Sequence, residues 1–127
     1  MSGSASTLPV ILVVEDEVFI RFDVADMLRE NGFEVIEAGD AQQGVDALNS
    51  GARIDLVFSD VHMPGPMNGL GLAIHILENH PALPVILTSG AILALESAAL
   101  PSALIPVEPK PYDPQTVLAR IHGALGL

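Results

Sequence analysis

The sequence predicts an α/β fold in which a doubly wound sheet of five parallel strands is flanked by five helices. Two observations favour this class: short apolar runs alternate with longer segments of helical period, and several of the runs are almost wholly aliphatic. Aliphatic strands are typical of a sheet covered on both faces, and regular alternation of strand and helix indicates parallel pairing.

The expected elements follow one another along nearly the whole chain. Apolar runs predict strands at 10–14, 33–36, 54–58, 85–87 and 103–107. Helices are expected at 18–31, 41–49, 70–79, 91–100 and 114–124. In the first helix, Ile20, Val24, Met27 and Leu28 form one stripe, which should face the sheet. Asp40 and Asp113 precede the second and last helices, where each could act as an N-cap.

Length and composition indicate one domain. The 127 residues show no internal repeat and no linker, so we expect a flexible tail at 1–8 and a single domain at 9–127. The chain has no cysteine, which excludes disulfides and thiolate metal sites and suits a reducing cytoplasm. Its start lacks the pattern of a secretory signal, and no apolar run approaches the ~20 residues of a membrane span.

The charge of the chain is strongly negative. Sixteen acidic residues oppose five basic ones, for a net charge of −11. This charge repels nucleic-acid phosphates and anionic lipid, so we expect neither a nucleic-acid nor a membrane partner. The single lysine, Lys110, lies between Pro109 and Pro111, where a solubilising lysine would seldom be placed.

Several polar residues follow the expected strands. Glu15 and Asp16 follow the first, Asp60 the third, Thr88 the fourth and Lys110 the fifth. In an open parallel sheet these exits converge at one edge. Each residue alone has an ordinary explanation as a turn or a strand end. Together, however, three carboxylates would repel one another unless a cation neutralised them, and a site of oxygen ligands suits Mg²⁺, with Mn²⁺ as a second candidate.

The same residues fit phosphoryl transfer. One carboxylate could act as the nucleophile and form an acyl phosphate. The metal ion, the ammonium of Lys110 and the hydroxyl of Thr88 could offset charge on the transferred oxygens.

In this order, the motifs resemble the receiver domain of bacterial two-component response regulators, the CheY-like family. The motifs are Val-Val-Glu-Asp-Glu at 13–17, Asp-Val-His-Met-Pro-Gly at 60–65, Leu-Thr-Ser-Gly at 87–90 and Pro-Lys-Pro-Tyr at 109–112. The resemblance covers about residues 9–127 and indicates a stand-alone, single-domain, cytoplasmic form. It implies a flavodoxin-like sheet of strand order 2-1-3-4-5.

The resemblance also implies roles for individual residues. Asp60 would accept a phosphoryl group from a sensor histidine kinase or a histidine phosphotransfer protein. Asp16, Asp60 and the backbone carbonyl of His62 would bind Mg²⁺ directly, and Glu15 would assist, partly through water. Lys110 and Thr88 would contact the phosphate. Such a chain catalyses only its own phosphorylation and dephosphorylation, so it is not an enzyme in the usual sense, and it signals by binding a downstream protein.

One position departs from the family pattern. Receivers commonly carry an aromatic residue three positions before the lysine, and this chain has Val107 there. A short β-branched side chain has little reach, so the signal would have to travel by displacement of loops and helices. His62 and Gly90 occupy positions that influence phosphate lifetime in the family, and the lifetime does not follow from them.

Two surfaces are candidates for partners. Phe19 and Phe22 lie on the polar side of the first helix, where Phe19 could help to bind the phosphate donor; partial burial at the helix edge is the alternative. The apolar segment 91–100, with the fifth strand and helix, could form a homodimer or target face. A closely packed Ala-rich helix is the alternative there.

Two other functions remain open from the sequence. One is a pseudo-receiver that keeps the fold but is never phosphorylated, although Asp60, Thr88 and Lys110 are intact. The other is a small Mg²⁺-dependent aspartyl phosphatase. Such enzymes usually carry a second acid two residues after the nucleophile, where this chain has His62.

Overall fold

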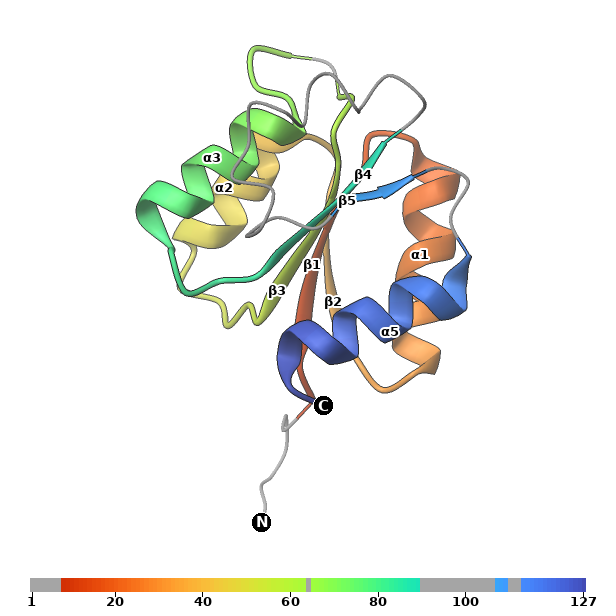
Figure 1. The fold of residues 1–127 in the computed structure, drawn as a ribbon. Coiled ribbons are helices and arrows are strands. Elements are labelled where there is room, and N and C mark those ends of the chain that lie inside the picture. Colours follow the sequence, from red (N-terminus) through yellow and green to blue (C-terminus); the bar gives the residue numbers. More distant parts are fainter. Residues whose placement is uncertain (1–7, 64, 90–106, 110–112) are drawn as a thin grey trace.

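The structure is a computed structural model that describes residues 8–63, 65–89, 107–109 and 113–127. Strands and helices alternate along these residues (Figure 1). The elements are β1 (Val10–Val14), α1 (Val18–Glu30), β2 (Glu34–Ala38), α2 (Ala41–Asn49), β3 (Leu56–Asp60), α3 (Gly69–Asn79), β4 (Val85–Ser89), β5 (Val107–Pro109) and α5 (Pro114–Leu125). The helix expected at 91–100, the start of the fifth expected strand and most of the expected N-terminal tail lie outside the described residues.

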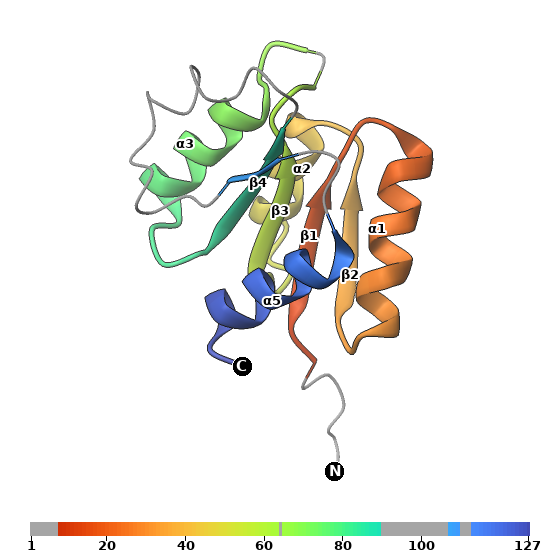
Figure 2. The same ribbon diagram turned by 45° about the vertical axis from the view of Figure 1, so that its right-hand side comes forward.

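The five strands form one parallel sheet in the order β2-β1-β3-β4-β5, which confirms the predicted strand order. Helices α2 and α3 lie on one side of this sheet, and α1 and α5 lie on the other (Figures 1 and 2). The predicted doubly wound α/β fold is therefore confirmed.

Each face of the sheet has its own apolar core, and β1 contributes to both. Ile11 and Val13 pack with the buried residues of α1 and α5, whereas Leu12 and Val14 pack with those of α2 and α3. All five residues of β1 are buried. Burying a large aliphatic side chain stabilises a fold by roughly 1.5–3 kcal/mol. The aliphatic run that predicted a strand covered on both faces is thus explained by two helical layers.

Helix α1 buries the predicted stripe, and its end corrects one strand boundary. Val24 and Leu28 are buried, while Ile20 and Met27 pack at the edge of the same core. After the helix, the N–H of Phe33 donates to the carbonyl of Leu28 at 3.1 Å, and its ring is buried. Phe33 was predicted to start the second strand. It belongs instead to the turn that ends α1, because its backbone completes the last helical turn while its ring enters the core.

Strands β3 and β4 extend farther toward their carboxyl ends than predicted. The sequence placed the third strand at 54–58, but β3 runs from Leu56 to Asp60. Ser59 pairs with Val14 of β1, and Asp60 pairs with Thr88 of β4. Hydrogen bonding to neighbouring strands, rather than side-chain polarity, sets the end of a strand. Asp60 is therefore the last residue of a buried strand.

The helix caps partly match the prediction. The Asp40 carboxylate accepts a hydrogen bond from the Gln43 N–H at 2.8 Å, which confirms the predicted cap of α2. Asp113 is the N-cap residue of α5, but its side chain makes no cap bond and accepts from the Thr116 hydroxyl at 3.2 Å instead. Pro114 follows it, and its fixed φ angle suits the first helical position.

The helices are short. α1 has 13 residues, whereas a membrane span needs about 20. Within the ranges that the structure describes, no helix combines the length and the apolar character needed to cross a membrane.

Because the central sheet is buried, we expect truncation of one of its core side chains to lower the free energy of unfolding substantially. Ile86 of β4 is fully buried, whereas Ile74 of α3 is 45% exposed. We expect Ile86→Ala to lower the free energy of unfolding by about 2–5 kcal/mol, because it removes apolar contacts and leaves a cavity. Ile74→Ala removes the same atoms from the surface and should change it by no more than about 0.5 kcal/mol. Urea denaturation measures both, and equal losses would contradict the burial assigned to Ile86.

Candidate functional site

The candidate site lies where β1 and β3 end. Val14 and Ser59 are register partners in the two strands. Glu15 and Asp16 follow β1 directly, and Asp60 is the last residue of β3. Parallel pairing therefore brings these three acids to the same edge of the sheet, at the top of Figure 1.

The three acids form a cluster that could hold a metal ion. Glu15, Asp16 and Asp60 can each offer one carboxylate oxygen, and these oxygens lie within 4.8 Å of one another. Two negative charges at that separation repel by about 3–4 kcal/mol, with an effective dielectric constant of about 20. Glu15 and Asp60 are 4% and 6% exposed, so water screens them poorly. The all-oxygen donor set fits a hard divalent cation, which would turn this repulsion into attraction.

Glu15 is fixed from several sides. Its N–H donates to the carbonyl of Ala38 in β2 at 3.0 Å, and its carbonyl accepts from Arg21 at 3.0 Å. Its carboxylate oxygen Oε2 accepts from the N–H of Glu17, the N-cap residue of α1, at 3.1 Å. The buried carboxylate is thus held near the start of α1, where unpaired N–H groups favour a negative charge.

Asp60 is held by the backbone around it. Its Oδ1 accepts a hydrogen bond from the N–H of His62 at 3.2 Å, and its carbonyl accepts from the Ser59 hydroxyl at 3.0 Å. The next residue, Val61, donates its N–H to the carbonyl of Thr88 at 2.9 Å. The β3 exit is therefore tied to the β4 exit beside it.

Thr88 lies next to Asp60 on the neighbouring strand. The two residues are register partners, and Thr88 is 2% exposed. Adjacent strands are about 4.8 Å apart, so the side chains of Thr88 and Asp60 are neighbours where β3 and β4 end.

The structure brings together four of the predicted site residues: Glu15, Asp16, Asp60 and Thr88. His62 is exposed two residues after Asp60, and the role predicted for its carbonyl stays a prediction. Lys110 lies outside the described residues, so its place in the site also stays a prediction.

Sequence reasoning missed the role of Gly69, the first residue of α3. Its N–H donates to the carbonyl of Val61 at 2.8 Å. A Cβ atom at this position would overlap the carbonyl oxygen of Asp60 and lie 2.7 Å from the Cα of Val61. Only glycine lets the start of α3 pack directly on the backbone at the end of β3. The preceding Asn68, which caps α3 by accepting from the Gly71 N–H, was the available signal for this helix start.

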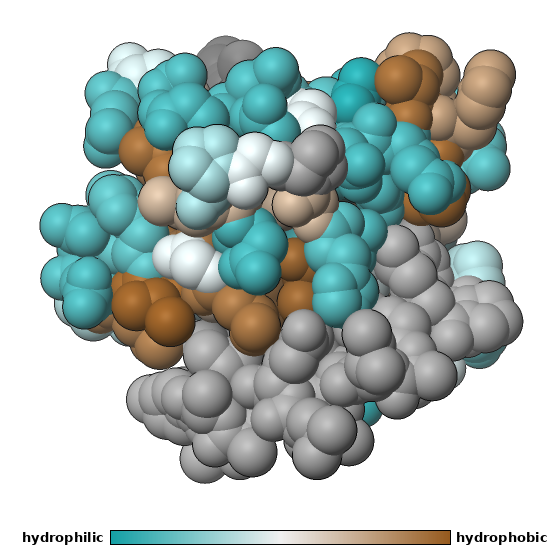
Figure 3. All heavy atoms as spheres, turned by 90° about the horizontal axis from the view of Figure 1, so that it is seen from above, coloured by the Kyte–Doolittle hydropathy of each residue, from teal (hydrophilic) through white to brown (hydrophobic). Residues whose placement is uncertain are grey.

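The surface around the site is mostly polar. Figure 3 looks onto the end of the molecule where the strands exit, and hydrophilic side chains dominate the described part of this view. Hydrophobic side chains gather at its right-hand rim, on the side where α1 lies. On α1, Val18, Phe19 and Phe22 are 46%, 83% and 47% exposed; we call these three residues the α1 apolar patch. The predicted exposure of Phe19 and Phe22 is confirmed.

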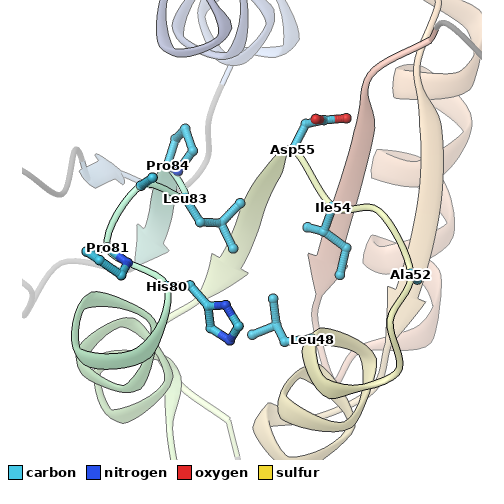
Figure 4. A pocket seen from close by; sticks show the side chains of 9 residues that line it. Leu48, Ala52, Ile54, Asp55, His80, Pro81, Leu83 and Pro84 are labelled. Carbon is cyan, nitrogen blue, oxygen red and sulfur yellow. The ribbon is translucent and has the colours of Figure 1, made fainter.

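A separate pocket of about 450 Å³ lies at the other end of the sheet (Figure 4). It is formed by the segments that precede β3 and β4, among them Ile54, Asp55, Leu83 and Pro84, together with Leu48 and His80. Because Asp60 and Thr88 are at the opposite ends of these strands, this pocket is not part of the acidic site.

Comparison with known families identifies the family of this chain. The model of the response regulator receiver domain matches residues 11–122, which span β1 to α5. This chain belongs to the response regulator receiver family. Membership of this family accounts for the resemblance of the sequence motifs and for the observed strand order.

Relatives and solved structures support the same family. The transcriptional regulatory protein PdtaR of Mycobacterium tuberculosis is 35% identical over 116 residues, which cover 91% of this chain and 56% of PdtaR. The DNA-binding response regulator MtrA of Mycobacterium leprae is 31% identical over 121 residues, covering 91% of this chain and 50% of MtrA. A response regulator receiver protein from Sinorhizobium medicae superposes with a TM-score of 0.85 at 26% identity, covering 96% of this chain and 98% of the other.

The matched region is a larger part of this chain than of its curated relatives. This receiver chain spans about half the length of the curated relatives named above. NtrX of Brucella abortus is matched over 94% of this chain but only 27% of its own, with 32% identity and a TM-score of 0.84. The shared part is the receiver unit in each case.

The close contact at Gly69 predicts a specific cost for adding one methyl group. We expect Gly69→Ala to lower the free energy of unfolding by about 1–3 kcal/mol, because the Cβ meets backbone atoms that cannot move aside without disturbing β3. Gly123→Ala is the matched control, since its Cβ in α5 would meet nothing within 4 Å. That control should raise stability by about 0.4–1 kcal/mol. Thermal denaturation that ranked the two variants equally would contradict this packing.

Proposed function

We propose that this receiver accepts a phosphoryl group on Asp60 from a phosphohistidine, in a reaction that requires Mg²⁺, and signals by binding a protein partner. The observation that carries the proposal is the cluster of Glu15, Asp16 and Asp60, with Thr88 on the adjacent strand. The phosphohistidine would belong to a sensor histidine kinase or a histidine phosphotransfer protein, as is general for the family.

The donor set supports a magnesium site. The carboxylates of Asp16 and Asp60 and the carbonyl of His62 would hold Mg²⁺ directly, and Glu15 would contribute partly through water. Mn²⁺ has the same preference for oxygen and is a second candidate. When bound, the ion supplies positive charge that neutralises the acids and the transferred phosphoryl oxygens.

The transfer is a substitution at phosphorus. An oxygen of the Asp60 carboxylate forms a bond to phosphorus as the bond from phosphorus to the donor imidazole nitrogen breaks, and the imidazole keeps the electron pair. Thr88 would donate its hydroxyl hydrogen to a phosphoryl oxygen, and the ammonium of Lys110 would pair with another. Later attack by water would release inorganic phosphate and restore the carboxylate. The receiver would thus act on no separate substrate.

The output of this chain is proposed to be a protein contact in the cytoplasm. PdtaR and MtrA are named as a transcriptional and a DNA-binding regulator, respectively. In the present chain, a net charge of −11 disfavours direct contact with nucleic acid. With Val107 at the usual aromatic position, loop and helix displacement would carry the signal. The proposed homodimer or target face involves 91–100, which lies outside the described residues.

The first test is the intact mass of the protein after incubation with acetyl phosphate and Mg²⁺. We expect one phosphoryl adduct on the wild type, no adduct on Asp60→Asn, and none after chelation by EDTA. Asp46→Asn, an exposed acid on α2, is the matched control and should be labelled like the wild type.

Other results would change the assignment. An adduct that persisted in Asp60→Asn would remove Asp60 as the acceptor. Absence of any adduct, both with acetyl phosphate and with a panel of histidine kinases, would favour the pseudo-receiver. Turnover of small phosphate esters would favour the aspartyl phosphatase.

The α1 apolar patch is proposed to bind the phosphate donor. Phe19 is 83% exposed and lies three residues after Asp16, so a partner that covered it would be adjacent to the acidic cluster. We expect Phe19→Ala to slow phosphoryl transfer from a cognate kinase or phosphotransfer domain by about tenfold, a typical effect of removing an aromatic anchor.

Acetyl phosphate separates docking from chemistry in this test. Phe19→Ala should be labelled by acetyl phosphate at the wild-type rate, because a small donor needs no protein contact. Ile74→Ala, an exposed apolar residue of α3, is the control for transfer from the kinase. A wild-type rate of kinase transfer in Phe19→Ala would remove the patch from donor binding.

A further inference from the structure

We propose that Arg21 is a positioning residue for the metal-binding loop: it fixes the peptide between Glu15 and Asp16 to the end of β2. The inference rests on the proposed function, because it concerns the acids that would hold Mg²⁺. Arg21 is not itself a metal ligand, and it is not among the site residues that the sequence predicts.

The contacts of Arg21 reach two elements. Its Nη1 donates to the carbonyl of Glu15 at 3.0 Å, and its Nε donates to Oε1 of Glu37 at 3.2 Å. The side chains of Arg21 and Glu37 are only 17% and 24% exposed. A charge-assisted pair with this degree of burial is held more firmly than a surface pair, and the planar guanidinium directs each N–H along a fixed line.

The contact with Glu15 matters because of the peptide it fixes. The carbonyl of Glu15 belongs to the same planar peptide as the N–H of Asp16, so holding its oxygen orients the backbone on both sides. The N–H of Glu15 is already bonded to Ala38. Both peptides of Glu15 are therefore tied to β2, one directly at Ala38 and one through Arg21 at Glu37. This arrangement determines where the carboxylates of Glu15 and Asp16 point.

The surroundings leave the guanidinium little freedom. A Cβ atom on Gly39 would lie 3.3 Å from Nη1 of Arg21 and 3.3 Å from Oε1 of Gln43. The ring of Phe22 lies on another side, with its centroid 5.7 Å from Cζ of Arg21. The guanidinium group of Arg21 is thus enclosed between the β2–α2 loop and α1.

Arg29 provides a control within the same network. It pairs with the other oxygen of Glu37 at 3.2 Å and reaches the carbonyl of Val35 at 3.4 Å, but its side chain is 46% exposed. In the part of the chain that the structure describes, its other ion pair is with Asp26 of α1, and it makes no hydrogen bond to residues 15–17. Arg29 therefore shares the charge and the partner of Arg21 without the contact to the acidic loop.

If Arg21 acts only through its charge, its loss should raise the affinity for a cation; if Arg21 positions the ligands, its loss should lower that affinity. Removing a positive charge near an acidic cluster should strengthen the binding of a cation. If Arg21 positions the ligands instead, its removal lets the loop sample other conformations and should weaken binding. Ordering the backbone of one residue corresponds to about a 5- to 30-fold change in an equilibrium constant. The direction of the change therefore distinguishes the two roles.

The experiment measures the Mg²⁺ dissociation constant of folded protein by isothermal titration calorimetry. We expect Arg21→Gln to bind Mg²⁺ about 5- to 30-fold more weakly, and Arg29→Gln to bind as tightly as the wild type or slightly more tightly. Arg21→Lys keeps the charge, but a single ammonium group cannot donate to Glu15 and Glu37 in the same planar geometry. This variant should therefore also bind Mg²⁺ more weakly. Unchanged or tighter binding in Arg21→Gln, or equal weakening in both glutamine variants, would overturn the proposal.

A second measurement tests the role of Arg21 without relying on Mg²⁺ binding. Amide hydrogen exchange of Glu15 and Glu17, followed by NMR without metal, reports on the loop itself. We expect faster exchange in Arg21→Gln and Arg21→Lys than in Arg29→Gln. If the wild type bound no Mg²⁺, the proposed function would fail, and the exchange rates would still decide whether Arg21 orders the loop. Equal exchange in all variants would refute the role of Arg21.

Discussion

Parallel pairing of β1 with β3 is the constraint on which the acidic site depends. Because Val14 and Ser59 are register partners, Asp60 ends β3 beside the point where Glu15 leaves β1. A shift of one residue in this register would turn every following side chain to the opposite face and separate the acids. Both strands are buried on both faces, so two apolar cores hold the register in place. The chemistry at the edge of the sheet thus depends on aliphatic packing in its middle.

The site places like charges where the fold alone would disfavour them. Glu15 and Asp60 are buried, so each loses part of its hydration and the two negative charges repel each other. Neither free-energy cost would arise if the two acids were dispersed over the surface. The surrounding structure limits their freedom to move apart: Glu15 is bonded to β2, Asp60 is tied to the β4 exit, and the start of α3 packs against β3 through Gly69. A preorganised set of oxygen ligands is the physical result, and a divalent cation is the partner that such a set favours.

Much of the candidate site followed from the sequence because its ligands are adjacent to strand ends. Glu15, Asp16, Asp60 and Thr88 each lie within two residues of the end of an apolar run, and the convergence of parallel strand exits is a general rule. Gly69 and Arg21 were missed for a different reason. Gly69 is needed because another backbone approaches it, and Arg21 matters through a carbonyl six residues earlier and a carboxylate on β2. Neither relation has a signature in hydropathy or spacing.

The sequence by itself determined the α/β class, the strand order implied by its family motifs and the buried stripe of α1, because these depend on periodicity and on local residue preferences. The Asp40 cap of α2 belongs to the same group, since it joins residues three positions apart. Only the tertiary structure decided that β3 continues to Asp60 and that Phe33 lies in a turn. Strand ends are set by hydrogen bonds to residues far away in the chain. Phe33 lies outside β2 because its N–H is bonded to the carbonyl of Leu28 and its ring packs in the core.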